Sequence, residues 1–575
     1  MASMIAENEL MDGGSEPSRF PVLWATQAGE IGTPFAFSCG YVWELAALKA
    51  GEELQLPPNR GITILMKNGL GYFCGVLVKD KEEVAKREET FRKIMMKVMR
   101  DPIQYWAGFK KEMQVNLDYV KNFDLEKATD LELVEHMEKT WAIAERHLKI
   151  HFLVMYPFLA AYMMLEQMCQ EIFKIDENDP AFIKLMRGFD SLVFTIDRKL
   201  WELAGRAKEL GLEPFFDRVE GKPLLDELKK SEKGRVWVGE FQSFLKKYGF
   251  RNETFTDASF PSWVEDPKIP LHHIKGFLTR TDQFDLDTVR KRQIRERKKV
   301  EKDFISRVPK GKEKMSLMDI LGAILFSWRF KTWVKNKEAL KFAALLGTGQ
   351  QFGVFNEEHN LYIEQCFTVG FRMIALEAGK RLVKAGALDN PEDVFYLRYS
   401  EVRRYLLKAE WYDCRPLTAK RRAGYKPGGP PYIGDPTTVE MDLALSKIVG
   451  VAARGAGMAD KEDADLCGIG ACPGVSEGPA RLVFDTSELH TVQEGEILVV
   501  DTVWTTWTPV FSRIKGLVTN IGGTLSHSAI VAREYDVPAV LATGEATKKV
   551  KTGQWLRVDG TRGTVKIFPE GPDKS

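Results

Sequence analysis

The spacing of apolar residues indicates a long helical region in the middle of the chain. Between about residues 82 and 410, apolar side chains recur every three or four positions with charged side chains between them, as in EEVAKREETFRKIMMKVM (82–99) and EQCFTVGFRMIALEAGKRLVKAG (364–386). This period is typical of amphipathic helices that bury one face. We therefore predict a mostly helical body.

A different pattern precedes this region. The stretch GITILMKNGLGYFCGVLVKD (61–80) has two apolar runs on either side of Asn68-Gly69, a pair that favours tight hairpin turns. We predict two short strands here, so that a small β-containing cap comes before the helical body.

The C-terminal segment alternates between short β-rich runs and one helix. The sequence predicts strands within 494–500, 516–520 and 538–544, a helix over 526–535, and a hairpin over 554–568 around Asp559-Gly560. Such an alternation is typical of a compact α/β unit.

A proline- and glycine-rich segment separates the two regions. In TAKRRAGYKPGGPPYIGDP (418–436), the residues from Pro427 to Gly434 would interrupt any helix or central strand. A short helix is predicted after it, over 438–454. The sequence thus predicts an α+β multidomain protein with a β-containing cap (1–81), a mostly helical domain (82–417), a linker or hinge region (418–465) and a C-terminal domain (466–575).

Composition and charge narrow the list of partners. The 82 basic and 81 acidic side chains nearly cancel, so we expect neither nucleic acid nor a membrane as partner. The longest apolar run, 152–165, is too short for a bilayer core of about 30 Å and contains Pro157, so it is interpreted as a buried helix. Seven cysteines without a CxxC pair, and an N-terminus without a secretion signal, favour a cytoplasmic protein without a metal site.

One charge run needs its own interpretation. The segment RKRQIRERKKVEKDF (290–304) mixes acidic with basic side chains and keeps Ile294 and Val300 for a buried stripe. We predict a helix with a solvated charged face, and an anion-binding surface is the alternative.

The segment with the clearest chemistry is GGTLSHSAIVARE. Gly522 and Gly523 allow backbone N–H groups to approach a ligand, and Thr524 or Ser526 can cap the helix that follows. The free N–H groups of a first helical turn bind anions. A neutral His527 there could attack a phosphoryl group and hold it as a phosphoramidate. Taken alone, however, a histidine in this position is more often a surface or capping residue.

The wider sequence carries a family resemblance. Together with VPAVLATGEAT and VDGTRGTV, the same segment closely resembles the swivelling phosphohistidine domain of phosphoenolpyruvate synthase, pyruvate phosphate dikinase and rifampicin phosphotransferase. The resemblance covers about 466–568 and implies a swivelling β/β/α domain in which His527 carries the phosphoryl group. Arg533 and Glu534 belong to the same segment and are interpreted as residues that hold the domain together.

The resemblance also implies a partner. In these families an ATP-grasp domain transfers the β-phosphoryl group of ATP to the histidine, with release of AMP and phosphate. Nothing in this sequence looks like that domain, because the N-terminal cap is too short and the helical region has no glycine-rich phosphate loop. We therefore expect a separate ATP-grasp subunit to bring ATP and Mg²⁺, and no cofactor bound tightly by this chain.

Two further stretches point to an acceptor domain. KYGFRNETFTDASFPSWVEDP (247–267) and residues 355–402 resemble the helical acceptor-binding region of rifampicin phosphotransferase-like proteins, and 56–80 looks closer to the large subunit of phenylphosphate synthase. Phe250 departs from the rifampicin pattern, because relatives often carry histidine there. The helical domain is thus expected to bind an acceptor, and a phenol is the class that the second resemblance implies.

Several residues are candidates for acceptor chemistry. A phenol has a pKa near 10, as tyrosine does, so a base would help it to attack. His151 is the candidate base, with a satisfied core histidine as the alternative. Arg251 is the candidate phosphoryl clamp, with an ion pair to Glu253 or Glu265 as the alternative. Weaker acceptor-binding candidates are Arg372, His359, Glu358 and Tyr156, the last of them part of an aromatic stripe that could simply be core.

The function that these resemblances imply is phosphoryl transfer from His527 to a phenolic hydroxyl, giving an aryl phosphate. Two alternatives remain open at this point. One is a phosphotransferase for a larger alcohol or antibiotic, and the other is a phospho-carrier that passes its phosphoryl group to another protein. The long aromatic-rich helical region argues against a simple carrier.

Overall fold

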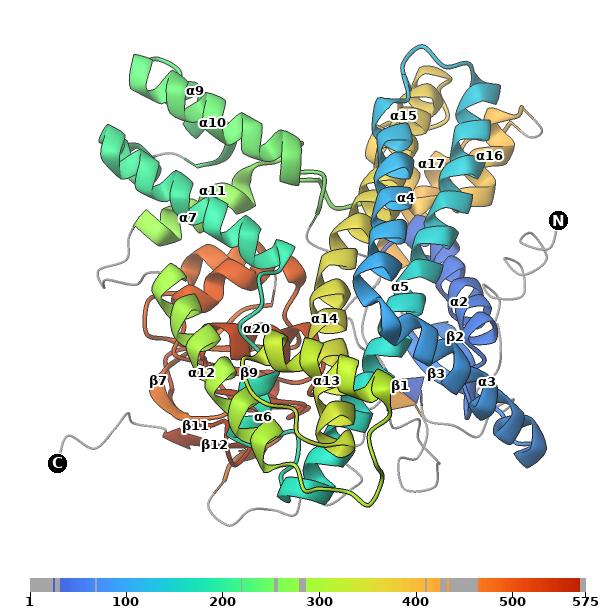
Figure 1. Ribbon diagram of the computed structural model, residues 1–575. Helices are drawn as coiled ribbons and strands as arrows, with labels where there is room; N and C mark the ends of the chain where they lie inside the picture. The colour runs from blue at the N-terminus through green and yellow to red at the C-terminus, as the bar shows by residue number, and fades with distance from the viewer. Residues whose placement is uncertain are drawn as a thin grey trace.

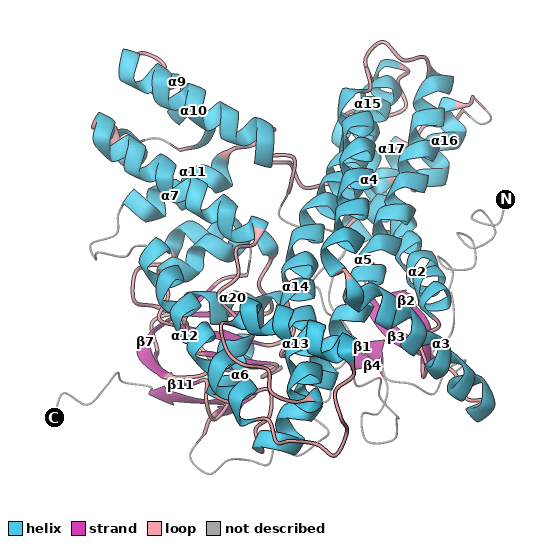
Figure 2. Cartoon of the chain, viewed as in Figure 1, coloured by secondary structure: helices cyan, strands magenta, loops and turns pink. Residues whose placement is uncertain are grey.

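The computed structural model describes residues 24–25, 32–67, 70–218, 220–252, 257–278, 286–408, 411–424, 432–433, 464–484 and 486–568. The described chain forms a helical body, a second group of helices and a C-terminal sheet domain (Figure 1). Helices dominate, and the strands lie in two separate sheets (Figure 2). The predicted α+β multidomain class is confirmed.

The smaller sheet belongs to the N-terminal cap. Its strand order is β2 (Asn59–Lys67), β3 (Leu70–Leu77), β1 (Trp24–Ala25) and β4 (Tyr432–Ile433), and all of its pairs are antiparallel. The pairing of β2 with β3 confirms the hairpin predicted at 61–80. Strand β4 comes from the segment predicted to be a linker, so the chain returns to the cap after the helical body. The rest of Pro427–Gly434, and the helix predicted at 438–454, lie outside the described residues.

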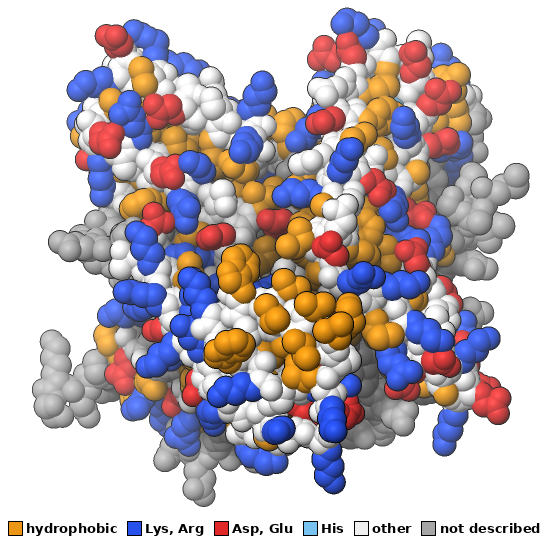
Figure 3. Space-filling model, in the orientation of Figure 1, with side chains coloured by type: hydrophobic (Ala, Val, Ile, Leu, Met, Phe, Trp, Pro, Cys, Tyr) orange, Lys and Arg blue, Asp and Glu red, His pale blue; other side chains and the backbone are white. Residues whose placement is uncertain are grey.

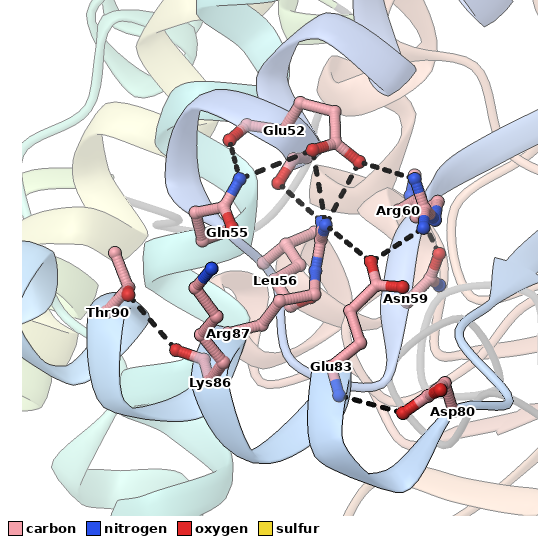
Figure 4. A network of polar contacts seen from close by, with 12 residues as sticks. Glu52, Gln55, Leu56, Asn59, Arg60, Asp80, Glu83, Lys86, Arg87 and Thr90 are labelled. Atoms are coloured by element: carbon pink, nitrogen blue, oxygen red, sulfur yellow. Dashed lines mark hydrogen bonds and ion pairs between the residues drawn. The ribbon is translucent and has the colours of Figure 1, made fainter.

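A buried arginine joins the cap to the helices around it. Arg87 on α3 (Lys81–Arg100) donates from Nε to the Leu56 carbonyl at 2.8 Å. Its Nη1 donates to Glu52 on α2 (Pro34–Leu54) at 3.0 Å and to Glu83 at 3.4 Å (Figure 4). A guanidinium this deeply buried is stable only when its donors are satisfied, so the network fixes α2 and α3 against each other.

The helical body is built around one long helix. Helix α5 (Asp130–Phe173) begins at a capping box between Thr129 and Glu132 and runs on through Pro157. By length and composition α5 could cross a membrane, but 67% of its most apolar stretch is buried inside the protein, which confirms the interpretation of 152–165 as a buried helix. Around it lie α4 (Pro102–Asn122), α14 (Lys337–Glu364), α15 (Phe371–Lys384), α16 (Tyr399–Leu406) and α17 (Arg415–Gly424), with a π-helical turn at 365–370 between α14 and α15.

A second group of helices packs on the C-terminal domain. The group comprises α7 (Leu192–Leu210), α8 (Glu213–Arg218), α9 (Gly221–Leu228), α10 (Glu232–Tyr248) and α11 (Lys268–Leu278). Its core, centred on Trp237 and Phe241, is continuous with Trp507 and Phe511 of the C-terminal domain. The helical region therefore contains two hydrophobic cores, one around α5 and one shared with the C-terminal domain.

The C-terminal domain is a mixed sheet with α20 (His527–Tyr535) and the short α21 (Ala546–Lys549). Its strand order is β5 (Leu466–Cys467), β12 (Thr564–Phe568), β11 (Trp555–Asp559), β7 (Val475–Leu482), β8 (Ile497–Val500), β9 (Gly516–Thr519), β10 (Ala539–Leu541) and β6 (Ile469–Cys472). The strands, helix and hairpin predicted in 494–568 are confirmed. Strands β5 to β7 were not predicted, because their glycine-rich sequence carries a weak β signal.

Three further helices pack on the core around α5. They are α6 (Pro180–Leu185), α12 (Leu286–Arg307) and α13 (Leu317–Phe330). Helix α12 contains the charge run 290–304, and its outer side is solvated as predicted. Its inner side differs from the prediction, because Arg290 and Gln293 are buried while Ile294 and Val300 are only partly so.

Candidate functional site

His527 is the first residue of α20, after a tight loop that follows β9. Gly522 in this loop has a φ of 130°, which side chains rarely allow, and a Cβ there would lie 3.1 Å from Ser526 Oγ. Ser526 caps α20: its Oγ accepts from the Ala529 N–H at 3.4 Å and donates to the Gly523 carbonyl at 2.8 Å. The loop and cap together fix the start of the helix, and with it the His527 ring.

The His527 side chain is 14% exposed and contacts two side chains from other elements. The hydroxyl of Thr508, in the 3₁₀ segment Thr505–Ser512, lies 3.3 Å from Nε2. A carboxylate oxygen of Glu357, on α14, lies 3.4 Å from Nδ1. Because a carboxylate attracts a proton on Nδ1, it favours the tautomer in which Nε2 keeps its lone pair. This preference rests on charge alone, because Nδ1 forms no hydrogen bond within the described residues.

A second carboxylate lies at the same helix start. Thr524 Oγ1 donates to Glu177 Oε2 at 3.1 Å, and Glu177 lies in the turn between α5 and α6. The four residues predicted to bind the phosphoryl group, Gly522, Gly523, Thr524 and Ser526, lie in the loop and cap directly before His527. In this arrangement the hydroxyls of Thr524 and Ser526 are engaged with Glu177 and with the helix cap.

The other end of α20 docks on α12 through charged groups. Arg290 donates to Glu534, and Gln293 Nε2 donates to the carbonyls of Arg533 at 3.2 Å and Glu534 at 2.8 Å. Asp536, just after the helix, pairs with Arg187 and Arg292. Within the domain, Arg533 Nε donates to the Ala471 carbonyl at 2.8 Å, in line with a structural role. Glu534, by contrast, holds the C-terminal domain to the helical body.

A buried pair links α20 to α7. The Tyr535 hydroxyl donates to Asp197 Oδ2 at 2.6 Å. Burial raises the pKa of Asp197 to about 7, and the hydrogen bond from Tyr535 and the charge of Arg251 oppose this rise. Burial thus outweighs both effects and holds the pKa of the Asp197 carboxyl well above its usual range.

Arg251, the predicted phosphoryl clamp, lies near this interface. Its guanidinium lies over the Trp263 ring, 4.9 Å from the centroid. Its charge also helps to lower the pKa of His273, which burial brings to about 3. His273 Nε2 lies 3.0 Å from the carbonyl of Thr506, close in sequence to Thr508. Arg251 thus lies shortly after α10, beside the helices on which the C-terminal domain rests.

His151, the predicted base, lies in the core of the helical body. Its Nδ1 contacts Nε2 of His359, and His359 Nδ1 lies 3.0 Å from the Phe355 carbonyl. A carbonyl only accepts, so His359 donates to it and accepts from His151. Burial lowers the pKa of His359 to about 4 and that of His151 well below its usual value. His151 and His359 thus lie in contact with each other. His151 packs on Trp43 and not on His527.

Arg372 and Glu358 have contacts of a structural kind. Arg372 Nε donates to Glu265 at 2.8 Å and its Nη1 to the Ser259 carbonyl at 2.6 Å, so it joins the two stretches expected to bind the acceptor. Glu358 accepts from Trp106 Nε1 at 3.0 Å and faces away from His527.

Tyr156 lines a large cavity of about 1390 Å³ between α3, the β2–β3 hairpin and α5. Phe158 and Tyr162 point to the opposite side of α5, because each helical residue turns about 100° from the last. Helix α5 therefore separates the large cavity from the space beside His527.

A small cavity of about 60 Å³ lies beside His527, enclosed by α5, α7, α14 and α20. Thr508 and Glu357, which both contact His527, form part of its wall. Gln350 and Asp197 add polar groups. Most other wall residues are apolar or aromatic, among them Phe158, Tyr162, Phe189, Phe194 and Leu525.

The sequence did not point to Glu357 or Thr508. Glu357 stands directly before Glu358 and His359 in FNEEHN, where both neighbours were candidates. Helix α14 is buried on several sides, so its apolar pattern does not show which of the three faces the C-terminal domain. Only the structure distinguishes them.

Two parts of the chain match known families. Residues 492–563, which include His527, match the family described as PEP-utilising enzyme, mobile domain. Residues 150–348, which include His151 and Arg251, match the rifampicin phosphotransferase fourth domain.

Curated relatives agree with these matches. YvkC of Bacillus subtilis, an uncharacterised phosphotransferase, is 27% identical over 424 residues, which cover 72% of this chain and 47% of YvkC. Rifampicin phosphotransferase of Streptomyces sviceus is 29% identical over 362 residues, covering 62% of this chain and 37% of the relative. A probable phosphoenolpyruvate synthase of Pyrococcus horikoshii is 47% identical over 100 residues, covering 17% and 12%. The chain thus spans less than half the length of each of these relatives. It combines a mobile domain like that of PEP-utilising enzymes with a region like the fourth domain of rifampicin phosphotransferase.

Proposed function

We propose that this chain is the histidine-bearing subunit of a phosphotransferase. His527 accepts the β-phosphoryl group of ATP from a separate ATP-grasp subunit and passes it to the hydroxyl of a small phenol. The observation that carries the proposal is the position of His527 at the start of α20, with Nε2 beside Thr508 and Nδ1 beside Glu357. The similarity of residues 492–563 to a mobile domain supports the carrier role.

In the charging step, Nε2 attacks the β-phosphorus of ATP that the partner holds with Mg²⁺. The P–N bond forms as the bond between the β-phosphorus and the oxygen of AMP breaks, and water then cleaves the β–γ anhydride bond to release phosphate. The partner supplies the nucleotide chemistry. This chain supplies the nucleophile and the N–H groups of the first turn of α20, whose positive end favours the added negative charge.

In the transfer step, the phenol oxygen attacks the phosphorus of phosphohistidine. The O–P bond forms, the P–Nε2 bond breaks, and the electron pair returns to the imidazole. The phenol proton must pass to a base, because a phenol with a pKa near 10 is mostly protonated at pH 7. Glu357, which contacts His527, is one candidate base, and His151 is the other; Arg251 is the candidate clamp for the phosphoryl group.

The size of the cavity beside His527 limits the acceptor that could bind there. Its volume of about 60 Å³ is below the roughly 150 Å³ of an engineered cavity that binds benzene. It is far below the roughly 300–1,000 Å³ of pockets for drug-sized ligands. A single aromatic ring would need a modest widening between α5 and α20, whereas an antibiotic-sized alcohol would need a different site. The aromatic lining also suits a phenol ring.

The test follows each half-reaction separately. The purified chain is incubated with its ATP-grasp partner, Mg²⁺ and ATP labelled at the β position, and then chased with phenol. We expect an acid-labile, base-stable label on the wild type, none on His527→Ala, and labelled phenyl phosphate after the chase. AMP formation by this chain alone, or label retained on His527→Ala, would contradict the proposal.

A second phosphoryl donor allows the transfer step to be tested without the ATP-grasp partner. Phosphoramidate phosphorylates histidine directly, so it can charge the wild type without ATP. Transfer from this adduct to phenol, but not to rifampicin, is the expected result. Transfer to rifampicin alone would favour the larger acceptor, and transfer to neither would contradict an acceptor site on this chain.

A further inference from the structure

The exposed side of α13 is apolar over its whole length. Leu317, Met318, Leu321, Leu325, Trp328 and the nearby Trp333 are each 49–84% exposed, and together they are called the α13 face. Figure 3 shows hydrophobic side chains gathered at the centre of this side of the molecule. The two tryptophans alone carry about 150–250 Å² each. The α13 face therefore exceeds the roughly 300–600 Å² of the largest apolar patch on a typical monomer.

The opposite side of α13 holds the helix firmly in place. Ala323 and Phe330 are buried in the core around α5. A capping box between Ser316 and Asp319 fixes its first turn, and Arg329 Nη2 donates to the Gly347 carbonyl on α14 at 3.3 Å. The α13 face is thus a fixed surface on a well-packed helix.

Basic side chains surround the α13 face. Five exposed lysines flank it, and within the described part of the chain they form no ion pair: Lys310, Lys312, Lys314, Lys331 and Lys335. The acidic residues nearby are already engaged, since Glu313 pairs with Lys337 at 2.8 Å and Asp319 caps α13. The rim therefore carries unbalanced positive charge.

Helix α13 packs against α14, the helix that carries the His527 contact Glu357. Helix α14 receives Arg329 of α13 at Gly347 and presents Glu357 to His527. Ten residues of helix separate these two points, which is about 15 Å at 1.5 Å per residue. A protein bound to the α13 face would therefore lie close to the contact between α14 and His527 of the C-terminal domain.

We propose that the α13 face is the docking surface for the nucleotide-binding subunit that charges His527. This inference rests on the proposed function. The partner would present an apolar patch with an acidic rim, because that surface complements the exposed tryptophans and the unpaired lysines. A second copy of this chain is a poorer fit, because a two-fold contact would bring the two basic rims together.

The test compares variants in the charging reaction. The partner is the ATP-grasp protein purified from native cells by its ability to label wild-type His527 from ATP labelled at the β position. Leu325→Glu/Trp328→Glu is the test variant. Trp411→Glu is the matched control, because Trp411 is 72% exposed and lies outside the α13 face. Circular dichroism and thermal melting establish that each variant is folded.

We expect the partner concentration for half-maximal charging to rise at least about tenfold in the test variant, since interface tryptophans commonly dominate binding. The rate at saturating partner should change little, and Trp411→Glu should behave as wild type. If the double variant does not fold, Lys312→Glu/Lys335→Glu should raise the same concentration severalfold at low salt and less at high salt.

The outcomes separate this inference from the proposed function. A wild type that is never charged contradicts the proposed function itself. A charged wild type with an equally charged test variant contradicts only the docking surface. Two other results would also overturn it: wild-type binding to phosphatidylserine vesicles that the variant loses, or a wild-type dimer that the variant dissociates, each with charging unchanged.

Discussion

The Nδ1 atom of His527 lies 3.4 Å from a carboxylate oxygen of Glu357, and the two residues belong to different domains. Glu357 can therefore act on His527 only while the C-terminal domain rests on α14. Replacement of Glu357 by Gln keeps the shape of the side chain and removes its charge. We expect Glu357→Gln to charge normally with the partner and to transfer to phenol about 10- to 100-fold more slowly.

Rapid-quench measurement of the loss of label from phosphorylated His527 after addition of phenol checks this expectation. Glu358→Gln is the matched control, because Glu358 faces Trp106 and should retain the wild-type rate. Equal transfer rates in Glu357→Gln and wild type would remove Glu357 from the chemistry.

The residues predicted from the sequence as base and clamp are tested in the same assay. His151→Ala and Arg251→Ala are expected to leave the charging of His527 intact and to slow transfer to phenol by at least about tenfold. His359→Ala serves as a control for His151, because it disturbs the same buried pair without removing the candidate base. If His151→Ala and His359→Ala lose the same activity, His151 supports the core and the base lies elsewhere.

Under the proposed function the C-terminal domain leaves α14 to reach the nucleotide, so the charged contacts of α20 should control its release. Arg290→Met removes the ion pair of the buried Glu534 carboxylate and leaves it the hydrogen bond from the Gly188 N–H. We expect trypsin to cut within 418–465 and to release a fragment that contains His527, several times faster in Arg290→Met than in wild type. Arg307→Met, which removes an exposed pair with Asp303, is the control. A segment 418–465 that resists protease in all three proteins would contradict a mobile domain.

Buried histidines make the stability of the fold dependent on pH. Burial lowers the pKa of His136 and His147 to about 4, whereas a histidine in the unfolded chain titrates near 6.5. Below pH 6.5 the unfolded chain therefore binds more protons, and the free energy of unfolding falls until the folded-state pKa is reached. For each such histidine, the free energy of unfolding should fall by up to about 1.4 kcal/mol between pH 7.5 and 5.5.

Urea unfolding at the two pH values measures this loss. His136→Gln should reduce the difference between pH 7.5 and 5.5 by about 1 kcal/mol relative to wild type. The same pH dependence in wild type and His136→Gln would show that His136 does not titrate with unfolding.

The sequence predicted the C-terminal domain better than the acceptor side. The turn residues around His527 act locally, so Gly522 and Ser526 could be assigned their roles in the loop and cap from sequence alone. The partner carboxylate Glu357 depends on how α14 is rotated between two cores, which no local pattern records. The glycine-rich strands β5 to β7 were missed for a related reason, since their place in the sheet is set by neighbours from distant parts of the chain.

The carboxylates of Glu357 and Glu177, near the start of α20, would also affect the direction of the proposed phosphoryl transfer. A phosphoryl group on His527 would add nearly two negative charges beside Glu357 and Glu177. The docked position therefore costs more free energy for the loaded histidine than for the empty one. An aryl phosphate formed there would be repelled by the same two side chains. Under the proposed function, docking on α14 would thus favour transfer of the phosphoryl group from His527 to the acceptor over the reverse reaction. The aryl phosphate would then leave, while the C-terminal domain with unphosphorylated His527 could stay docked.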